Sequence, residues 1–418
     1  MKKQMLECDD RLSQMEPMVI NGSCPRFADL LGLAHELCLA SARLDSQIHK
    51  QTARGVAELI SGANCYYSNL IEGQRASLTD INDAMRHTAH LGSDAKHRNL
   101  AFAHIIADRW ANSQRLTQAN LIFFLQETHR LFCEYLPVDM LILEDCSVMV
   151  PGEFRRKEVR VGRHLPPRSE HLSIFLNHYS EVYGQRLESA DKGGITRLTS
   201  IVAAFAAHHR LVWIHPFADG NGRVARITLD AMLRACGVTG TALWSMSRGL
   251  VKSADTYNSL LAQADKPRSG DRDGGGNLTE RGLAEFCRFG LQAGIDQARF
   301  MASMIDLDSF GERVHNYFRR VRQSTLRPES AYLYMHAWTM GKFERGDAAR
   351  LTGLSERTAR TILSKLLAEG FLVSDTPKGR VRIGLPVHAM SFLLPNLYPH
   401  GDIKIADQDL RALHANKD

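Results

Sequence analysis

The 418-residue sequence predicts a mainly α-helical protein of two or three domains. Apolar residues recur at spacings of three and four over most of the first 310 positions, the pattern of helices with one buried face. Hydrophobic residues make up 44% and charged residues 23%, which excludes a largely disordered chain. No apolar stretch is long enough to cross a bilayer, and no apolar run follows the lysines near the start. We therefore expect no membrane partner and no secretory signal.

The cysteines indicate the compartment. Eight are scattered along the chain without a Cys-x-x-Cys pair or clustered histidines. This usage is typical of free thiols in a reducing cytoplasm and argues against a disulfide framework or a zinc site. We expect a cytoplasmic protein.

The apolar periodicity predicts nine helices before residue 310. They span Phe27–Ala53, Ala57–Leu70, Leu78–His87, Leu100–Trp110, Leu121–Tyr135, Ile174–Tyr183, Thr196–Arg210, Val224–Cys236 and Leu283–Ile305. Thr117 provides a polar start ahead of the helix that ends at Tyr135. The Gly-rich stretch 267–277 is interpreted as a surface loop, because helical periodicity resumes directly after it.

One short stretch departs from the helical pattern. Val148–Val150 and Glu158–Val161 predict two strands around a Pro-Gly turn that begins at Pro151. A lone hairpin is marginally stable unless it packs on something. We expect it to be either a decoration or a flap over a site.

The segment after Pro328 has a compact pattern of its own. It predicts a helix over Glu329–Met340, a short helix around Asp347–Leu351, and a helix from Ser355 to Glu369. Phe371–Ser374 and Val381–Ile383 then predict a small hairpin. Helix, helix, turn, helix and hairpin is the order of a winged helix-turn-helix domain.

The third of these helices separates apolar from basic residues. Its N-cap is Ser355, and the apolar face carries Ile362, Leu363, Leu366 and Leu367. The opposite face carries Arg357, Arg360, Thr361, Ser364 and Lys365. Residues 311–384 contain 14 Lys and Arg against 7 Asp and Glu, whereas the remaining chain is nearly balanced. This surface could bind DNA, or it could serve protein contacts or dimerisation, and the sequence leaves both open.

The stretch from Ile214 to Arg226 carries the chemistry. It reads Ile-His-Pro-Phe-Ala-Asp-Gly-Asn-Gly-Arg-Val-Ala-Arg and runs from a loop into a helix. Backbone amides at a helix start bind anions, and glycines let a phosphate come close. Arg223 and Arg226 lie three apart and can face the same anion, Asp219 offers a hard oxygen for Mg²⁺, and His215 can take a proton near neutral pH. Together they predict phosphoryl or nucleotidyl transfer.

This stretch matches the signature His-x-Phe-x-Asp/Glu-Gly-Asn-Gly-Arg-x-x-Arg and therefore resembles the Fic (Fido) family. The likeness extends over roughly residues 20–385 and includes Pro151–Arg155, which looks like the flap of the family. It implies a Fic-type helical core with a β-hairpin flap. It also implies AMPylation, the transfer of AMP from ATP to a Ser, Thr or Tyr hydroxyl of a target protein or of the chain itself. Gly222 stands where a phosphate-transferring relative has Lys, which favours AMP transfer.

The resemblance also implies a role for each site residue. His215 would be the general base, Asp219 would hold Mg²⁺, and the flap 148–162 would pair with the target as an added strand. ATP would be bound by Gly220, Asn221, Gly222, Arg223, Val224, Ala225, Arg226 and Tyr257. Within this set, Gly220, Asn221 and Gly222 would cradle the α-phosphate, Arg226 would reach the γ-phosphate, and Tyr257 would pack on adenine.

A second motif, Ser68-Asn-Leu-Ile-Glu72-Gly73, is similar to the inhibitory motif of the self-inhibited class of the family. In that class Glu72 would pair with Arg226 and occupy the room needed by the γ-phosphate. In some members the same glutamate positions a water that removes AMP from the target. A bifunctional or mainly de-AMPylating enzyme is therefore an alternative.

These observations divide the chain into four parts. We expect an N-terminal helical region with the inhibitory helix over 1–115, a Fic core over 116–305, a winged helix over 311–386 and a tail over 387–418. Helices of the N-terminal half could pair in a homodimer. The alternative from another class is a DNA-linked regulator whose Fic core only senses nucleotide.

Overall fold

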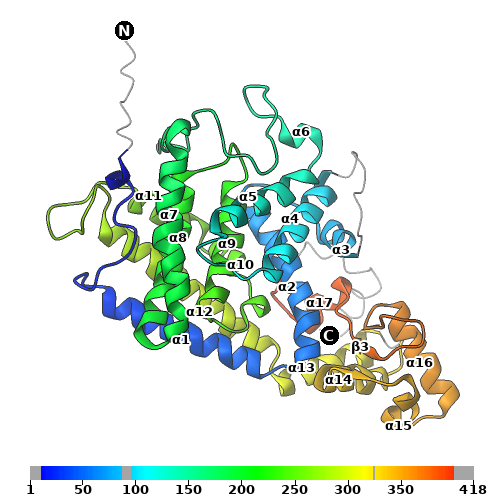
Figure 1. The fold of residues 1–418 in the computed structure, drawn as a ribbon. Coiled ribbons are helices and arrows are strands. Elements are labelled where there is room, and N and C mark those ends of the chain that lie inside the picture. The colour runs from blue at the N-terminus through cyan, green and yellow to red at the C-terminus, as the bar shows by residue number, and fades with distance from the viewer. Residues whose placement is uncertain (1–10, 87–95, 323–324, 400–418) are drawn as a thin grey trace, which may run out of the picture.

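The computed structural model describes residues 11–86, 96–322 and 325–399. It is mainly helical, as predicted (Figure 1). The helices up to residue 316 are α1 (Phe27–Ser46), α2 (Lys50–Ile71), α3 (Leu78–Arg86), α4 (Lys96–Ser113), α5 (Leu121–Glu134), α6 (Val138–Leu141), α7 (Leu172–Ser189), α8 (Gly194–Ile214), α9 (Asn221–Ala235), α10 (Met246–Val251), α11 (Ala254–Ala264), α12 (Glu280–Met304) and α13 (Leu307–Asn316). Among the described residues, no helix combines the length and the apolar character that crossing a membrane requires.

Helix α8 forms the centre of this part of the molecule. Residues 200–211 of α8 are all buried, and the helix contacts α1, α7, α9 and α12. Helix α9 follows α8 after a short loop and also contacts α2, α4 and α5. A loop between two such buried helices is fixed at both ends, which is a suitable place for side chains that must be held accurately.

Near the start of the chain, one predicted helix was wrong in its bounds. The helix expected over Phe27–Ala53 is two helices, because the chain turns at 47–49 and His49 caps α2 by accepting a hydrogen bond from the Gln51 amide at 3.2 Å. Helix α5 begins at Leu121, as predicted, and Thr117 lies in the turn ahead of it. The Asn120 side chain accepts the Thr117 amide at 2.8 Å and holds the preceding turn outside the helix.

The β-hairpin expected at 148–161 is not formed. Within the described segment 142–164, pairing is confined to two isolated contacts, Ile142 with Val148 and Val161 with His164. The buried side chain of Arg155 organises the segment instead. Its guanidinium donates to the backbone carbonyls of Lys157, Pro167 and His215, so the loop is held on a buried cation and not on a strand ladder.

The segment after Pro328 folds in the expected order. It contains α14 (Ser330–Met340), β1 (Lys342–Phe343), α15 (Ala348–Thr352), α16 (Glu356–Ala368), β2 (Leu372–Val373), β3 (Val381–Ile383) and α17 (Met390–Leu393). The strands form an antiparallel sheet of order β1-β3-β2, with Lys342 opposite Arg382 and Leu372 opposite Ile383. Ser355 caps α16 as predicted, and Ile362, Leu363 and Leu366 are buried.

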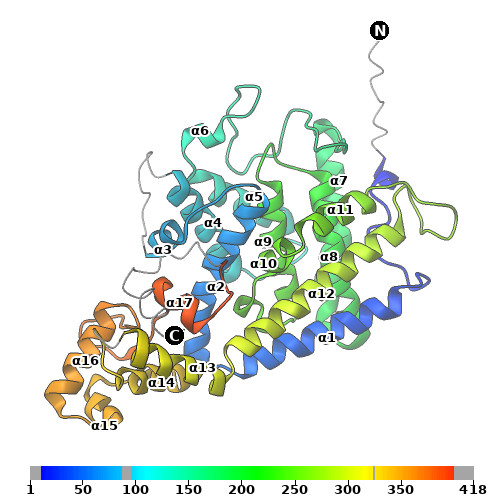
Figure 2. The same ribbon diagram turned by 180° about the vertical axis from the view of Figure 1, so that it is seen from behind.

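Residues 387–418 were expected to form a tail, but the described part of this segment, residues 387–399, packs on the rest of the molecule. Leu397 and Tyr398 are buried, and the Leu397 carbonyl accepts a hydrogen bond from the Tyr67 hydroxyl of α2 at 2.8 Å. Near the other end of α2, the Thr52 hydroxyl donates to the carbonyl of Trp338 in α14 at 2.7 Å. The C-terminal elements therefore lie along α2, at one end of the molecule (Figure 2). Residues 400–418 lie outside the described part.

Candidate active site

The signature residues form the loop between α8 and α9. Helix α8 ends where His215 takes a left-handed conformation, with φ of 50°, and α9 begins after Gly220, whose φ is 79°. A positive φ is uncommon for a non-glycine residue and turns the chain sharply. Asn221 closes the turn, because its side chain accepts the Phe217 amide at 2.9 Å and donates to the Phe217 carbonyl at 2.8 Å. The Asn221 side chain, expected at the α-phosphate, is thus engaged in holding the loop.

His215 has the environment of a neutral base. Burial lowers the pKa of its imidazole to about 4. Its Nδ1 lies 3.4 Å from the Val212 carbonyl, an atom that can only accept a hydrogen bond. Donation from Nδ1 leaves Nε2 as the nitrogen with a free lone pair.

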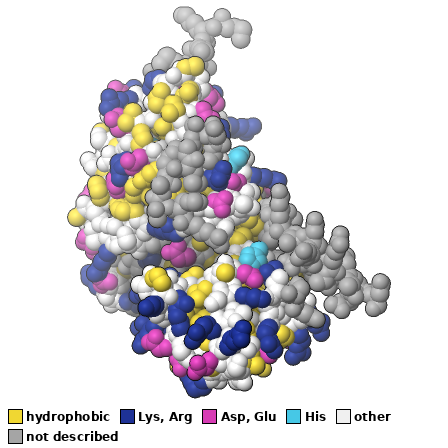
Figure 3. All heavy atoms as spheres, turned by 90° about the vertical axis from the view of Figure 1, so that its right-hand side faces the viewer, with side chains coloured by type: hydrophobic (Ala, Val, Ile, Leu, Met, Phe, Trp, Pro, Cys, Tyr) yellow, Lys and Arg dark blue, Asp and Glu magenta, His cyan; other side chains and the backbone are white. Residues whose placement is uncertain are grey.

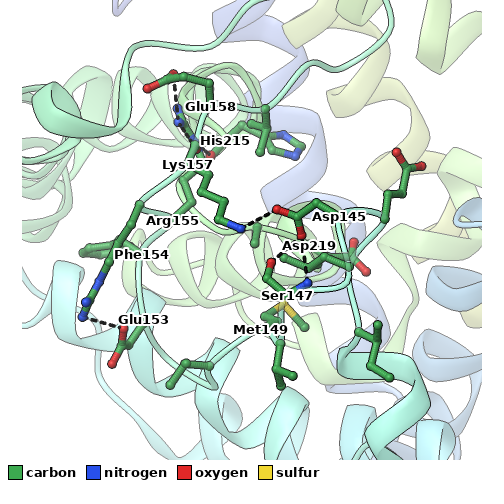
Figure 4. Close-up of a pocket in the computed structure, with 18 of the residues that line it drawn as sticks. Asp145, Ser147, Met149, Glu153, Phe154, Arg155, Lys157, Glu158, His215 and Asp219 are labelled. Carbon is green, nitrogen blue, oxygen red and sulfur yellow. Dashed lines mark hydrogen bonds and ion pairs between the residues drawn. The ribbon is translucent and has the colours of Figure 1, made fainter.

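His215 and Asp219 share a cavity of about 730 Å³ (Figure 4). The loop 142–160 forms another wall of this cavity, and the ion pair of Asp145 and Lys157 joins two parts of that loop. Val148 and Val150 of this loop are exposed. The His215 loop therefore faces an open space that is bordered by apolar and charged side chains.

Arg226 is buried on the first turns of α9, and α2 satisfies its guanidinium. Nε donates to the Ser68 hydroxyl at 2.9 Å, and Nη2 donates to the Ser68 carbonyl at 3.1 Å and to Glu72 Oε1 at 2.6 Å. The structure thus brings Ser68, Glu72 and Arg226 together, as the resemblance implies. Gly73 follows Glu72 with a positive φ of 72°, where the chain leaves α2.

The Glu72 carboxylate is ionised in this arrangement. Burial alone would raise the pKa of Glu72, but the positive charges of Arg226 and Arg223 outweigh it and hold the pKa below its usual value. The carboxylate also lies against Gly222, where an added Cβ would collide with Glu72 Oε1. The absence of a side chain at Gly222 is therefore what admits the carboxylate to the start of α9.

The neighbouring signature residues are also engaged. Arg223 donates to the Gln74 side chain at 3.1 Å and lies 3.6 Å from the Asp219 carboxylate, with its guanidinium over the Phe132 ring. Val224 and Ala225 are buried, and the Val224 amide already donates to the Gly220 carbonyl at 3.1 Å. The amide of Val224, which was expected among the ATP-binding residues, is thus used inside the helix.

Tyr257 is not placed to stack on a nucleotide base in this arrangement. It is buried, and its hydroxyl lies 2.9 Å from Nε2 of His208. Nδ1 of His208 in turn lies 3.1 Å from the Ala225 carbonyl. This chain of contacts ties α11 and α8 to the start of α9. In this arrangement Tyr257 supports the start of α9, and its packing on adenine stays a prediction.

Sequence reasoning missed two residues of the site. Arg155 was part of the flap motif, but its bonds to the Pro216 and His215 carbonyls were not foreseen. His129 of α5 belongs to no motif, yet its ring stacks on Phe217 with centroids 4.0 Å apart. From the sequence, His129 could be recognised only as a residue on the buried face of a predicted helix. Its contact with Phe217 joins segments far apart in the sequence, which no local pattern predicts.

Comparison with known proteins supports the family resemblance. Residues 124–233 match the model of the Fic/DOC family. The chain is 34% identical over 104 residues to the protein adenylyltransferase Fic of Aedes aegypti, covering 25% of this chain and 19% of that protein. It is 26% identical over 221 residues to the protein of the same name from Drosophila mojavensis, covering 51% of this chain and 40% of that protein. The chain thus spans about a fifth and two fifths of the length of these relatives.

Among solved structures, the chain is similar to a Fic family protein from Desulfovibrio desulfuricans G20. The TM-score is 0.49 and the sequence identity 17%, and the match covers 86% of this chain and 96% of the other. The match to the Fic/DOC family model confirms the predicted resemblance over residues 124–233, which include the signature.

The contacts of Arg226 lead to a stability prediction. Ser68→Ala leaves the buried Nε of Arg226 without its hydroxyl acceptor, and we expect the free energy of unfolding to fall by about 1–3 kcal/mol. Urea denaturation of the variant and of Ser113→Ala, which removes an exposed helix hydroxyl, measures the difference. Equal stability of the two variants would contradict the account of Arg226.

Proposed function

We propose that this chain is a protein adenylyltransferase that its own Glu72 holds inactive. The observation that carries the proposal is the buried Arg226, which pairs with Glu72 and Ser68 of α2 a short distance along α9 from the His215 loop. The similarity to proteins named protein adenylyltransferase Fic supports the same reaction. The target protein is any polypeptide with a hydroxyl side chain that fits the cavity beside His215.

In this reaction a Ser, Thr or Tyr hydroxyl of the target attacks the α-phosphorus of ATP. His215 Nε2 takes the hydroxyl proton, a bond forms between the hydroxyl oxygen and the α-phosphorus, and the bond from that phosphorus to the β-phosphate oxygen breaks. Pyrophosphate leaves, and AMP remains on the target. The amides at the start of α9 and the guanidiniums of Arg223 and Arg226 offset the phosphate charge.

Asp219 fits the expected Mg²⁺. Its side chain is exposed at the cavity, and a carboxylate oxygen is the ligand type that Mg²⁺ prefers. Among the described residues no three His, Cys, Asp or Glu side chains form a metal-binding group, so Asp219 would hold the ion together with phosphate oxygens and water. When bound, the ion supplies positive charge to the phosphates.

Glu72 inhibits because it competes with phosphate for Arg226. The γ-phosphate and the Glu72 carboxylate both carry negative charge and both need the same guanidinium. With Glu72 in place, ATP can bind only with its phosphates displaced from the in-line arrangement. Activation then requires the end of α2 to move, or Glu72 to be removed.

A second function is favoured by the surface of the C-terminal elements. Arg357, Arg360 and Lys378 are exposed, and no ion pair engages them within the described residues. Lys and Arg side chains gather over the lower part of the molecule, which holds these elements (Figure 3). We propose that residues 330–383 are a winged helix that binds duplex DNA with α16, and the order of helices and strands supports this interpretation.

The enzymatic proposal predicts opposite effects of two substitutions. Glu72→Gly frees Arg226 for the γ-phosphate, and we expect it to raise transfer of labelled AMP from ATP to proteins of a lysate, or to the chain itself, at least tenfold. Adding His215→Ala to this variant removes the base and abolishes the label. Equal activity of the parent chain and of Glu72→Gly would dismiss the inhibitory role.

The lowered pKa of His215 predicts the pH dependence of the reaction. The base must be neutral, and burial keeps it neutral down to a pH of about 4. In the Glu72→Gly variant kcat/KM should therefore stay level from pH 7 to pH 5.5. An imidazole of ordinary pKa would instead lose about eightfold over this range. Such a loss, in protein that stays folded by circular dichroism, would refute the proposed environment of the base.

The DNA proposal predicts salt-dependent binding. The chain should shift a duplex in a gel at low salt, and Arg357→Ala with Arg360→Ala should lower the slope of log K against log salt by about 2. The matched control, Arg43→Ala with Arg115→Ala, removes the same charge from exposed positions elsewhere. Absence of binding at low salt, or equal effects of the two double variants, would eliminate this function.

A further inference from the structure

His129 of α5 joins the two walls of the active-site cavity. Its ring is buried and parallel to the Phe217 ring, with an angle of 4° between the planes. Nδ1 lies 2.9 Å from the amide nitrogen of Gly152, in the loop that forms one wall. Nε2 lies 3.2 Å from the backbone carbonyl of Asp219, in the catalytic loop. One side chain therefore contacts both loops at once.

The chemistry of the two partners fixes how His129 bonds. The Gly152 amide can only donate, so Nδ1 must be the accepting nitrogen. The Asp219 carbonyl can only accept, so the proton must be on Nε2. The ring is thus held as one neutral tautomer, and each nitrogen serves a different loop.

The space around the ring leaves little freedom. A Cβ added at Gly220 would lie 3.5 Å from Cδ2 of His129, so the start of α9 passes directly beside the imidazole. Cys133, one turn further along α5, lies 3.3 Å from Nε2. A shift of the ring would therefore disturb the catalytic loop and the loop 142–160 together.

We propose that His129 is a positioning residue that sets the separation between the loop that receives the target and the loop that carries His215 and Asp219. The proposal rests on the proposed transfer reaction. A hydroxyl held on one loop must meet a phosphorus held on the other, and a misplacement of about 1 Å can cost a hundredfold in rate. Arg155 makes a parallel link at the His215 side, through the Pro216 and His215 carbonyls, so His129 governs the Asp219 side.

Two conservative substitutions separate the two bonds of the ring. The amide oxygen of His129→Asn can take the place of Nδ1, which keeps the Gly152 bond and loses the Asp219 bond. The amide nitrogen of His129→Gln can take the place of Nε2, which keeps the Asp219 bond and loses the Gly152 bond. A side chain with a merely structural role would respond similarly to both changes.

The test measures steady-state AMP transfer in the Glu72→Gly background together with hydrogen exchange of the Gly152 amide. For His129→Gln we expect about a tenfold rise in KM for the target, little change in kcat, and about tenfold faster exchange at Gly152. For His129→Asn we expect about a tenfold fall in kcat with KM and the exchange rate preserved. Thr128→Val, which changes the neighbouring buried residue on α5, should match the Glu72→Gly protein in all three quantities.

The two readouts distinguish failure of this inference from failure of the proposed function. If the Glu72→Gly protein transfers no AMP, the proposed reaction is wrong, and the exchange rates of the two His129 variants still decide whether the ring holds the loop. Equal exchange rates of the Gly152 amide in the two variants would overturn the positioning role. The same change in kcat and the same change in KM in both variants, with equal falls in thermal stability, would overturn it as well.

Discussion

The arrangement of the site depends on the buried guanidinium of Arg226. A charge removed from water must be paired, and leaving it unpaired is strongly destabilising. In this structure, the carboxylate of Glu72 and the hydroxyl and carbonyl of Ser68 supply the acceptors. We propose that a triphosphate takes their place through its negatively charged oxygens. In the proposed mechanism, the inhibited and active arrangements satisfy the same cation by different partners and differ mainly in the position of the end of α2.

The contacts along α2 place this competition in a wider setting. Near the start of α2, the Thr52 hydroxyl donates to the Trp338 carbonyl. Near the end of α2, the Tyr67 hydroxyl donates to the Leu397 carbonyl. Helix α2, with Ser68 and Glu72 at its end, is therefore packed between α9 and α10 on one side and the C-terminal elements α14 and β3 on the other (Figure 1). A movement of α2 that withdraws Glu72 would therefore change the packing of α2 on the helices of the site and on the C-terminal elements. Helix α2 is the element that these two parts of the chain share.

Much of this could be predicted from the sequence, because the information is local. The helical periodicity, the order of elements after Pro328 and the residues from His215 to Arg226 are properties of short segments. The prediction of a hairpin at 148–161 was wrong because the pattern of apolar residues does not reveal that Arg155 is buried. The hydrogen bonds from the Arg155 guanidinium to backbone carbonyls hold this segment in place of bonds between two strands. The bonds of His129 to Gly152 and Asp219, and the burial of Tyr257, depend on contacts between distant segments, which no motif encodes.

The most direct measurement of the central claim is a crystal structure of the Glu72→Gly protein with a non-hydrolysable ATP analogue and Mg²⁺. The account predicts the γ-phosphate on the guanidinium of Arg226 and the α-phosphate on the amides at the start of α9, open to attack from the side of His215. A triphosphate bound away from Arg226, with that guanidinium still satisfied by α2 alone, would contradict it.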